Sequence, residues 1–253
     1  MCIRDRLNVA LISVKFDQVS FKDHIDIYGT KFMQSLNKFC NIPITLYGES
    51  FYRSDLPGNY CMQNFEDTIP EHKDFVRYIK SSIGTDKKET NRLQKALRWS
   101  YKSFVIIHAL KFIPADLIVW LDGDVVATNP ISNNFFESIN KNFLCTVYPQ
   151  IIYNNLHIES GLVIFNKKHF FMDDLIQHYI EGYYEKKILS LKKPWDGFWL
   201  GDFVDKNKSK NICQRITPPF SNVSDYLRHN VGKQKFINTH LNKYSGRTLD
   251  FPL

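Results

Sequence analysis

The stretch "DLIVWLDGDVVATNP" at residues 116–130 constrains this chain most. The six residues from Leu117 to Asp122 carry one charge, which is the last. A short apolar run rich in β-branched residues predicts a strand that is buried on both faces, as in a parallel sheet. In an extended chain residues i and i+2 point to the same side, so Asp122 and Asp124 would project together, about 7 Å apart. Two such carboxylates repel each other unless a cation or a proton lies between them.

The chemistry of this motif favours a metal and a phosphate. Carboxylate oxygens are hard ligands that suit Mg²⁺ or Mn²⁺. Gly123 has no side chain, so a ligand can approach the backbone there. The carboxyl ends of parallel strands are also where open α/β sheets bind their ligands. Two aspartates in this position can instead be loop-solubilising residues or helix caps, and an Asp-x-Asp pattern is frequent by chance.

The remaining patterns predict one α/β domain with a mixed, mainly parallel sheet flanked by helices. Strand-like runs and helix-like periodicity alternate along most of the chain. Residues 50–90 are expected to be loop with one short helix near 71–80, and the chain after residue 190 is expected to be rich in loops. The predicted strands are 7–16, 42–49, 116–124, 143–149 and 160–166, and the predicted helices are 25–39, 91–112 and 172–188.

Composition excludes several classes of protein. The chain of 253 residues has a net charge of +7, but its Lys and Arg residues form no block longer than two, so no nucleic-acid partner is expected. The 5 cysteines are scattered without metal-ligand spacing, which predicts reduced thiols and a cytoplasmic location. No secretory signal or membrane span is evident. The opening "MCIRDR" at 1–6 reads as a leader that does not contribute to the fold, which leaves 7–253 as the domain.

Two chemistries fit an apolar strand that ends in Asp-x-Asp. In a haloacid-dehalogenase-type phosphatase the first aspartate, here Asp122, is the nucleophile toward phosphate, and D-G-D-V-V resembles that motif. The motif normally opens such a domain, whereas more than 100 residues precede it here. The later GDxxxD pattern also fails, because Lys206 of "GDFVDK" stands where the aspartate is required. In the second chemistry both carboxylates hold a metal that bridges the diphosphate of a nucleotide-sugar.

Several separated motifs support this second chemistry, and together they resemble bacterial or phage GT-A fold glycosyltransferases, similar to family 8 and its relatives. The resemblance extends from about residue 8 to 248. It implies a donor-nucleotide half at about 7–130 and an acceptor and sugar half at about 131–253. It also implies transfer of a sugar from a nucleoside diphosphate sugar, with UDP as the expected nucleotide, to a glycan or lipid-linked acceptor. The motifs, in chain order, are "DIYGTKFMQSLNKF", "RWSYKSFVIIHAL", "LIVWLDGDVVATNP", "HIESGLVIFNKKH" and "WDGFWLGDFVD".

The resemblance assigns roles at the matching positions. Asp122 and Asp124 match the metal-binding pair, and "THLNKYSGR" matches the segment that supplies a third ligand, here His240. A basic residue after that histidine contacts phosphate in the family, which nominates Lys243 or Arg247, although the usual GxKPW ending is absent. The mixed oxygen and nitrogen ligands favour Mn²⁺ over Mg²⁺.

The sugar side of the site is assigned from two further motifs. "WDGF" resembles the acidic segment near the reacting carbon and nominates Asp196, which could equally cap a helix. "ESGLVIFN" resembles the strand that lines the sugar and acceptor pocket, and Glu159 stands in it where relatives often have Asn. The resemblance nominates Asp196 and Glu159 as catalytic residues.

Three more residues are donor-binding candidates. Arg98 and Lys102 lie four apart on the long predicted helix and share a face, so an anion between them would relieve their repulsion. A solvated face explains the same spacing. Phe16, at the end of the first predicted strand, would lie near the nucleotide base. A GT-A-like domain that binds without turnover is a further alternative, as is peripheral association with the inner membrane face.

Overall fold

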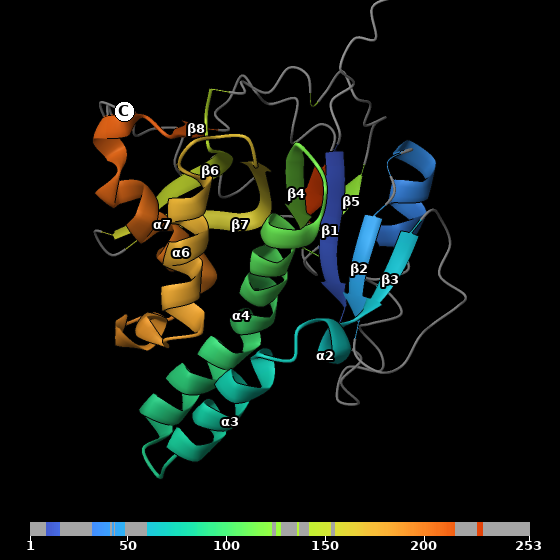
Figure 1. Cartoon of the computed structure of the whole chain (residues 1–253). Helices are drawn as coiled ribbons and strands as arrows, with labels where there is room; N and C mark the ends of the chain where they lie inside the picture. The colour runs from blue at the N-terminus through green and yellow to red at the C-terminus, as the bar shows by residue number, and fades with distance from the viewer. Residues whose placement is uncertain are drawn as a thin grey trace, which may run out of the picture.

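A seven-stranded sheet organises the protein in the computed structural model (Figure 1). The structure describes residues 9–15, 32–40, 42, 44–48, 60–122, 125–127, 136, 142–152, 155–215 and 227–229. The strand order is β3-β2-β1-β4-β7-β6-β8, and β5 and β9 form a separate two-stranded pair. The strands are β1 (Val9–Lys15), β2 (Ile44–Gly48), β3 (Tyr60–Asn64), β4 (Leu117–Leu121), β5 (Val125–Ala127), β6 (Cys145–Ile152), β7 (Asn155–Asn166), β8 (Cys213–Arg215) and β9 (Leu227–His229).

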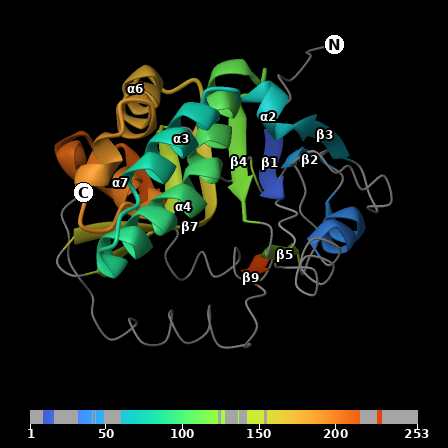
Figure 2. The same cartoon turned by 90° about the horizontal axis from the view of Figure 1, so that it is seen from below.

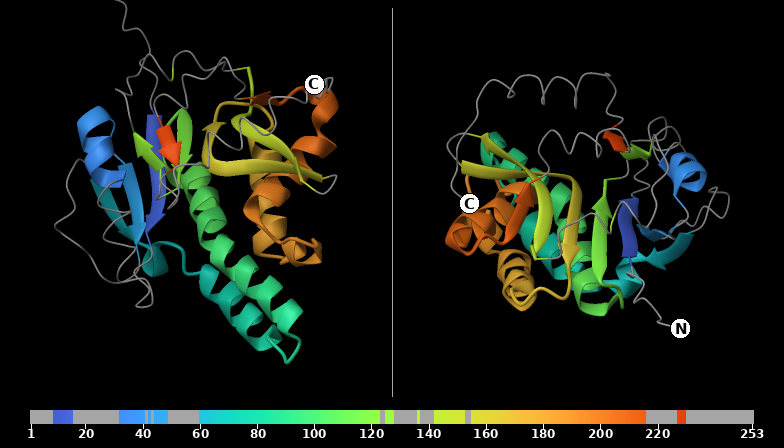
Figure 3. Two further views of the ribbon diagram at one scale, coloured as in Figure 1. Left: turned by 180° about the vertical axis from the view of Figure 1, so that it is seen from behind. Right: turned by 90° about the horizontal axis from the view of Figure 1, so that it is seen from above.

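The strand directions confirm the predicted fold class. The pairs β3–β2, β2–β1, β1–β4 and β6–β8 are parallel, whereas β7 is antiparallel to both of its neighbours. Figure 3 shows β1, β4 and β7 side by side at the centre of the sheet. The sheet is therefore mixed and mainly parallel, and the antiparallel strand β7 lies directly beside the strand that ends at Asp122.

Helices cover the sheet on the side seen in Figure 2, where α3, α4, α6 and α7 lie together. They are α2 (Phe65–Thr68), α3 (His72–Ser82), α4 (Lys87–Phe112), α6 (Met172–Tyr183) and α7 (Asp196–Lys206), with short 3-10 helices η2 (Lys187–Ser190) and η3 (Lys208–Lys210). A further helix at 32–39 packs into the core on the opposite face. None of the described helices combines the length and the apolarity that crossing a membrane requires.

Strand β4 is buried on both faces, as its sequence predicts. Ile118 and Trp120 belong to the core that α3, α4, α6 and α7 cover. Leu117, Val119 and Leu121 belong to the opposite core, together with residues of the helix at 32–39. Alternation along the strand therefore places residues 118 and 120, and by the same period residue 122, on the α4 side of the sheet.

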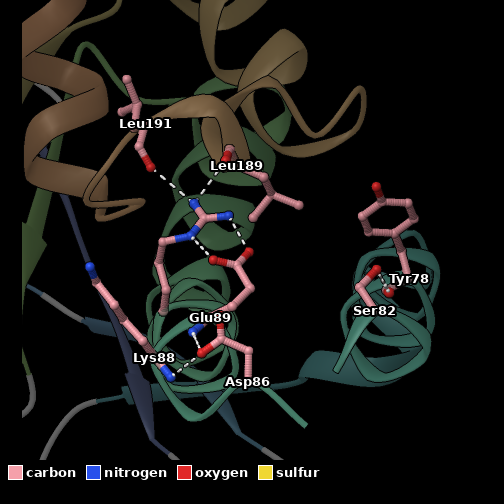
Figure 4. Close-up of polar contacts among 8 residues, drawn as sticks. Tyr78, Ser82, Asp86, Lys88, Glu89, Leu189 and Leu191 are labelled. Atoms are coloured by element: carbon pink, nitrogen blue, oxygen red, sulfur yellow. Dashed lines mark hydrogen bonds and ion pairs between the residues drawn. The ribbon is translucent and has the colours of Figure 1, made fainter. Parts of the chain in front are cut away.

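Helix α4 is fixed at its N-terminal end by polar contacts (Figure 4). The Asp86 carboxylate accepts hydrogen bonds from the backbone N–H groups of Lys88 and Glu89, which begins the helix four residues before the predicted start. Arg92 then donates to the carbonyl oxygens of Leu189 and Leu191 at 2.8 and 3.0 Å. These contacts join α4 to the segment that leads into α7.

Two segments differ from the sequence-based expectation. Residues 50–90 contain strand β3 and helix α2 as well as helix α3, which overlaps the expected short helix at 71–80. Strand β3 is partly exposed at the sheet edge and lacks a clear apolar alternation, which explains why its pattern was weak. The chain after 190 contains helix α7, which two glycines made a poor helix candidate.

Those glycines let α7 lie directly on β7. A Cβ atom built on Gly201 would overlap the backbone carbonyl oxygen of Leu156, and one on Gly197 would overlap that of Ile158. The low helix propensity of glycine is therefore offset by a close approach of helix and strand. This approach brings Asp196, the first residue of α7, against the centre of the sheet.

The described cysteines Cys40, Cys61, Cys145 and Cys213 are free thiols, and all except Cys61 are buried. Cys145 and Cys213 are register partners on β6 and β8, with their sulfur atoms 3.7 Å apart.

We expect Gly201→Ala to lower the free energy of unfolding by about 1–3 kcal/mol, because the added methyl group pushes α7 away from β7. Urea unfolding followed by circular dichroism measures this. Gly84→Ala is the matched control, since nothing lies within 4 Å of a Cβ at that position. It should be neutral or stabilising by up to about 1 kcal/mol. Equal effects of the two substitutions would contradict the packing account.

Candidate active site

Lys102 of α4 connects three segments of the chain at the centre of the site. Its Nζ atom lies 2.8 Å from Oδ1 of Asp122, which directly follows β4, and 3.3 Å from Oδ2 of Asp196 at the start of α7. The ammonium also donates a hydrogen bond to the carbonyl oxygen of Ser160 on β7. The Lys102 side chain is only 5% exposed. One buried cation therefore binds two carboxylates that are distant in sequence.

Asp122 is oriented by its neighbours in the same strand and in β7. The indole N–H of Trp120 donates to Oδ1 of Asp122 at 2.6 Å, as the shared side of residues i and i+2 allows. The backbone N–H of Asp122 donates to the carbonyl oxygen of Gly161 at 2.9 Å, which extends the β4–β7 pairing to this residue. The carboxylate is 20% exposed, so a ligand can reach it from the carboxyl end of β4.

The charges of this cluster suit an additional cation. Burying an ion is costly unless it is paired, and the ammonium of Lys102 is paired with both Asp122 and Asp196. Within the described residues of this cluster, one positive and two negative groups give a formal charge of −1. A residual negative charge in a partly buried site attracts cations more strongly than the same charge in bulk water. The carboxylate of Asp122, which its neighbours hold in one orientation, is therefore suited to act as a metal ligand.

Asp196 does not act as the N-cap of α7. Trp195 occupies that position, and its side chain makes no capping hydrogen bond. Asp196 is instead the first helical residue, where a negative charge is stabilised by the helix dipole, and its carboxylate contacts Lys102. The side chain is 6% exposed. The structure thus places Asp196 beside Asp122, which the sequence alone could not establish.

His157 lies beside this carboxylate and was missed by the sequence analysis. Burial lowers its pKa to about 4, an effect that Asp196 opposes and that Lys102 and Lys193 reinforce. Its ring packs edge-on against Phe198 with the ring centres 4.7 Å apart. Its buried Nδ1 atom has no hydrogen-bond partner. His157 opens the quoted segment "HIESGLVIFN", but a single histidine in a strand carries no distinctive spacing.

The two tryptophans of this region have different environments. Trp199 is buried, stacks on His178 and donates its indole N–H to the His178 carbonyl oxygen at 3.0 Å, so it is a core residue. Trp195 is only half-buried, and the ammonium groups of Lys193 and Lys95 lie 5.0 and 5.9 Å from its ring centre. Trp195 is therefore the one of the pair that a ligand could contact.

The other predicted site residues are not brought into this cluster by the described part of the chain. Arg98 is exposed and its guanidinium lies 5.4 Å from the ring centre of Trp99, whereas Lys102 is buried, so the two do not share one environment. For Glu159 the structure describes the backbone within β7 but not the side chain. The predicted residues outside the described ranges are Phe16, Gly123, Asp124, His240, Lys243 and Arg247.

We expect the neutral His157 to make stability pH-dependent. Its pKa in the folded state lies below the ordinary 6.5, so the unfolded chain binds more protons between pH 6.5 and about 4. The free energy of unfolding should therefore decrease as the pH falls through this range, by about 3 kcal/mol at most from this group.

Urea unfolding of the wild type and of His157→Gln at several pH values isolates this contribution. The stability difference between the two proteins should shrink as the pH falls from 7 to 4, because the glutamine does not titrate. A difference that stays constant over this range would contradict the assignment.

Comparison with known proteins gives a result only at the level of structure. No protein-family model matches the sequence, and no curated protein matches it. Among solved structures, mouse xyloside xylosyltransferase 1 in its apo form superposes with a TM-score of 0.59 at 9% identity, over 89% of this chain and 98% of that chain. An active-site mutant of LgtC has a TM-score of 0.50 at 10% identity, over 96% of this chain and 97% of that chain.

A third match is the apo form of the glycosyltransferase GlyE from Streptococcus pneumoniae TIGR4, with a TM-score of 0.51 at 12% identity. It covers 97% of this chain, but this chain spans only 52% of GlyE. Sequence identities this low show a shared fold. The chain has the GT-A fold found in glycosyltransferases.

Proposed function

We propose that this protein is a metal-dependent glycosyltransferase that moves a sugar from a nucleoside diphosphate sugar, in the first instance a UDP-sugar, to a glycan or lipid-linked acceptor. The observation that carries the proposal is the pair of carboxylates, the partly buried Asp122 and the buried Asp196, that the ammonium of Lys102 contacts at the carboxyl end of β4. The GT-A fold, which is found in glycosyltransferases, supports the proposal.

The proposed reaction requires two kinds of stabilisation. The bond between the anomeric carbon and the β-phosphate oxygen breaks, UDP leaves with the electron pair, and an acceptor oxygen forms the new bond as its proton passes to a base. Asp122, Asp124 and His240 would hold the divalent metal, with Mn²⁺ preferred, and the metal supplies Lewis-acid stabilisation of the diphosphate. Asp196 would stabilise positive charge that develops on the sugar ring.

The remaining candidates complete the proposed site. Lys243, Arg247 or Arg98 would contact phosphate, Phe16 would lie near the nucleotide base, and Gly123 would leave room for the donor. Glu159 would line the pocket for sugar and acceptor. The roles of Lys243, Arg247 and Glu159 come from the motif resemblance, whereas those of Arg98, Phe16 and Gly123 come from their positions in the sequence. Peripheral membrane association is proposed for a lipid-linked acceptor.

The alternatives differ in what they require. A haloacid-dehalogenase-type phosphatase needs a different fold from the GT-A fold of this chain, which removes the main support for Asp122 as a nucleophile toward phosphate. A domain that binds sugar nucleotides without turnover needs only the fold and the donor pocket. Turnover therefore separates the proposal from this second alternative.

We expect the protein to hydrolyse a UDP-sugar slowly in the presence of Mn²⁺ and to stop when EDTA is added, because water can replace the acceptor. Screening nucleotide-sugars by thermal shift with and without Mn²⁺ identifies the donor, since a ligand of the native state raises the melting temperature. Released UDP is then quantified for each hit. Binding without any UDP release would favour the non-catalytic alternative, and phosphate release from simple esters would favour the phosphatase.

We expect Asp124→Ala to abolish the Mn²⁺-dependent part of UDP binding, because it removes a proposed metal ligand. The affinity should fall about 100-fold or more, since even groups that only orient metal ligands are worth about 10–100-fold. Isothermal calorimetry with UDP, with and without Mn²⁺, measures the change. Asp205→Asn is the control, because Asp205 is an exposed residue in a surface ion pair with Lys208 and such pairs contribute little. Unchanged UDP binding by Asp124→Ala would contradict the metal site.

A further inference from the structure

Lys102 occupies a position in which it can control both carboxylates of the site at once. We propose that Lys102 is a positioning residue whose ammonium sets the arrangement of Asp122 relative to Asp196. The kinetic part of this inference rests on the proposed function, whereas its structural part does not. The established observation is the set of contacts from one Nζ atom to Asp122, Asp196 and the Ser160 carbonyl oxygen.

In the described part of the chain, the ammonium of Lys102 contacts oxygen atoms of three residues. A lysine ammonium has three N–H donors and no acceptor. Asp122 and Ser160 accept hydrogen bonds from this ammonium, and Asp196 forms an ion pair with it at 3.3 Å. These partners come from the end of β4, the middle of β7 and the start of α7. The Trp120 ring, whose centre lies 5.0 Å from Nζ, adds a cation–π contact. The charge is therefore bound by groups that the fold itself holds in place.

The two carboxylates would not keep this arrangement without the ammonium. Their contacting oxygens share one partner atom at 2.8 and 3.3 Å, which limits their separation to about 6 Å. Like charges this close repel each other, most strongly in a partly buried site. Asp196 is the first residue of α7, which lies directly on β7. Repulsion between the two carboxylates would therefore act on the start of this helix.

This geometry links the two halves of the proposed reaction. Asp122 belongs to the side that holds the leaving diphosphate, and Asp196 belongs to the side near the sugar carbon. Lys102 fixes the distance between them. A misplacement of about 1 Å in such a site can cost about 100-fold in rate. Lys102 would therefore act through Asp196, and its removal should affect the transfer step more than donor binding.

A double-mutant cycle of Lys102→Met and Asp196→Asn tests the coupling, with kcat and KM measured for hydrolysis of the donor identified by the screen. Each single variant should lower kcat by about 100-fold. The kcat of the double variant should also fall by about 100-fold rather than about 10⁴-fold, because the effects of residues that act through one another are not additive. The KM for the donor should change by less than about threefold in Lys102→Met.

Two further variants make the result specific to the buried ammonium. Lys102→Arg keeps a cation, so its kcat should be at least about tenfold higher than that of Lys102→Met. Lys111→Met makes the same change at an exposed position of the same helix and should leave kcat unchanged. Multiplicative losses in the cycle, or a wild-type kcat in Lys102→Met, would overturn the proposal.

The melting temperatures of the same variants test the structural part independently of turnover. Lys102→Met leaves the buried carboxylate of Asp196 and the partly buried one of Asp122 without their cation and should melt well below the wild type. Adding Asp196→Asn should recover part of that loss. If Lys102→Met does not fold, the cycle of Lys102→Arg and Asp196→Asn, with its own double variant, measures the coupling instead. Additive losses would overturn the structural link, and absence of turnover in the wild type with every donor would overturn the proposed function instead.

Discussion

The interaction on which the site depends is the ion cluster of Lys102 with Asp122 and Asp196. A buried lysine is stable only where the fold supplies paired negative charge and hydrogen-bond acceptors. Here the partners of the ammonium come from three segments, so α4, β4, β7 and α7 must all be in place before the cluster can form. The cluster therefore depends on the fold and joins the segments that carry Asp122 and Asp196.

The arrangement of the sheet explains how these segments meet. Strand β4 lies at the centre, parallel to β1 on one side and antiparallel to β7 on the other. Because β7 runs antiparallel to β4, its middle residues Ser160 and Gly161 lie beside the end of β4. A parallel neighbour would have its own end at this position. Helix α7 then approaches β7 closely through Gly197 and Gly201 and delivers Asp196. The contacts of Arg92 hold the segment before α7 against α4.

The sequence predicted the fold class and the central strand because both depend on local patterns. The apolar run of β4 is visible in five consecutive residues, and Asp122 follows it directly. The sequence indicated helix α7 only as a helix that Asp196 could cap, because its glycines lower local helix propensity and their benefit depends on contact with a distant strand. The role of Lys102 was not predictable either, since a lysine four residues after Arg98 has the pattern of a solvated helix face. Its burial becomes evident only when Asp196 and Asp122 are brought together in space.

The central claim is that a metal-bound nucleotide is held at the carboxyl end of β4, and anomalous diffraction tests it most directly. A crystal of the protein grown with Mn²⁺ and UDP, measured at the manganese absorption edge, locates the metal without reference to any motif. The account predicts an anomalous peak within about 2.0–2.3 Å of an Asp122 carboxylate oxygen, the range of divalent metal to oxygen distances, while Lys102 remains in contact with Asp196. Bound UDP with its manganese elsewhere on the surface would contradict it.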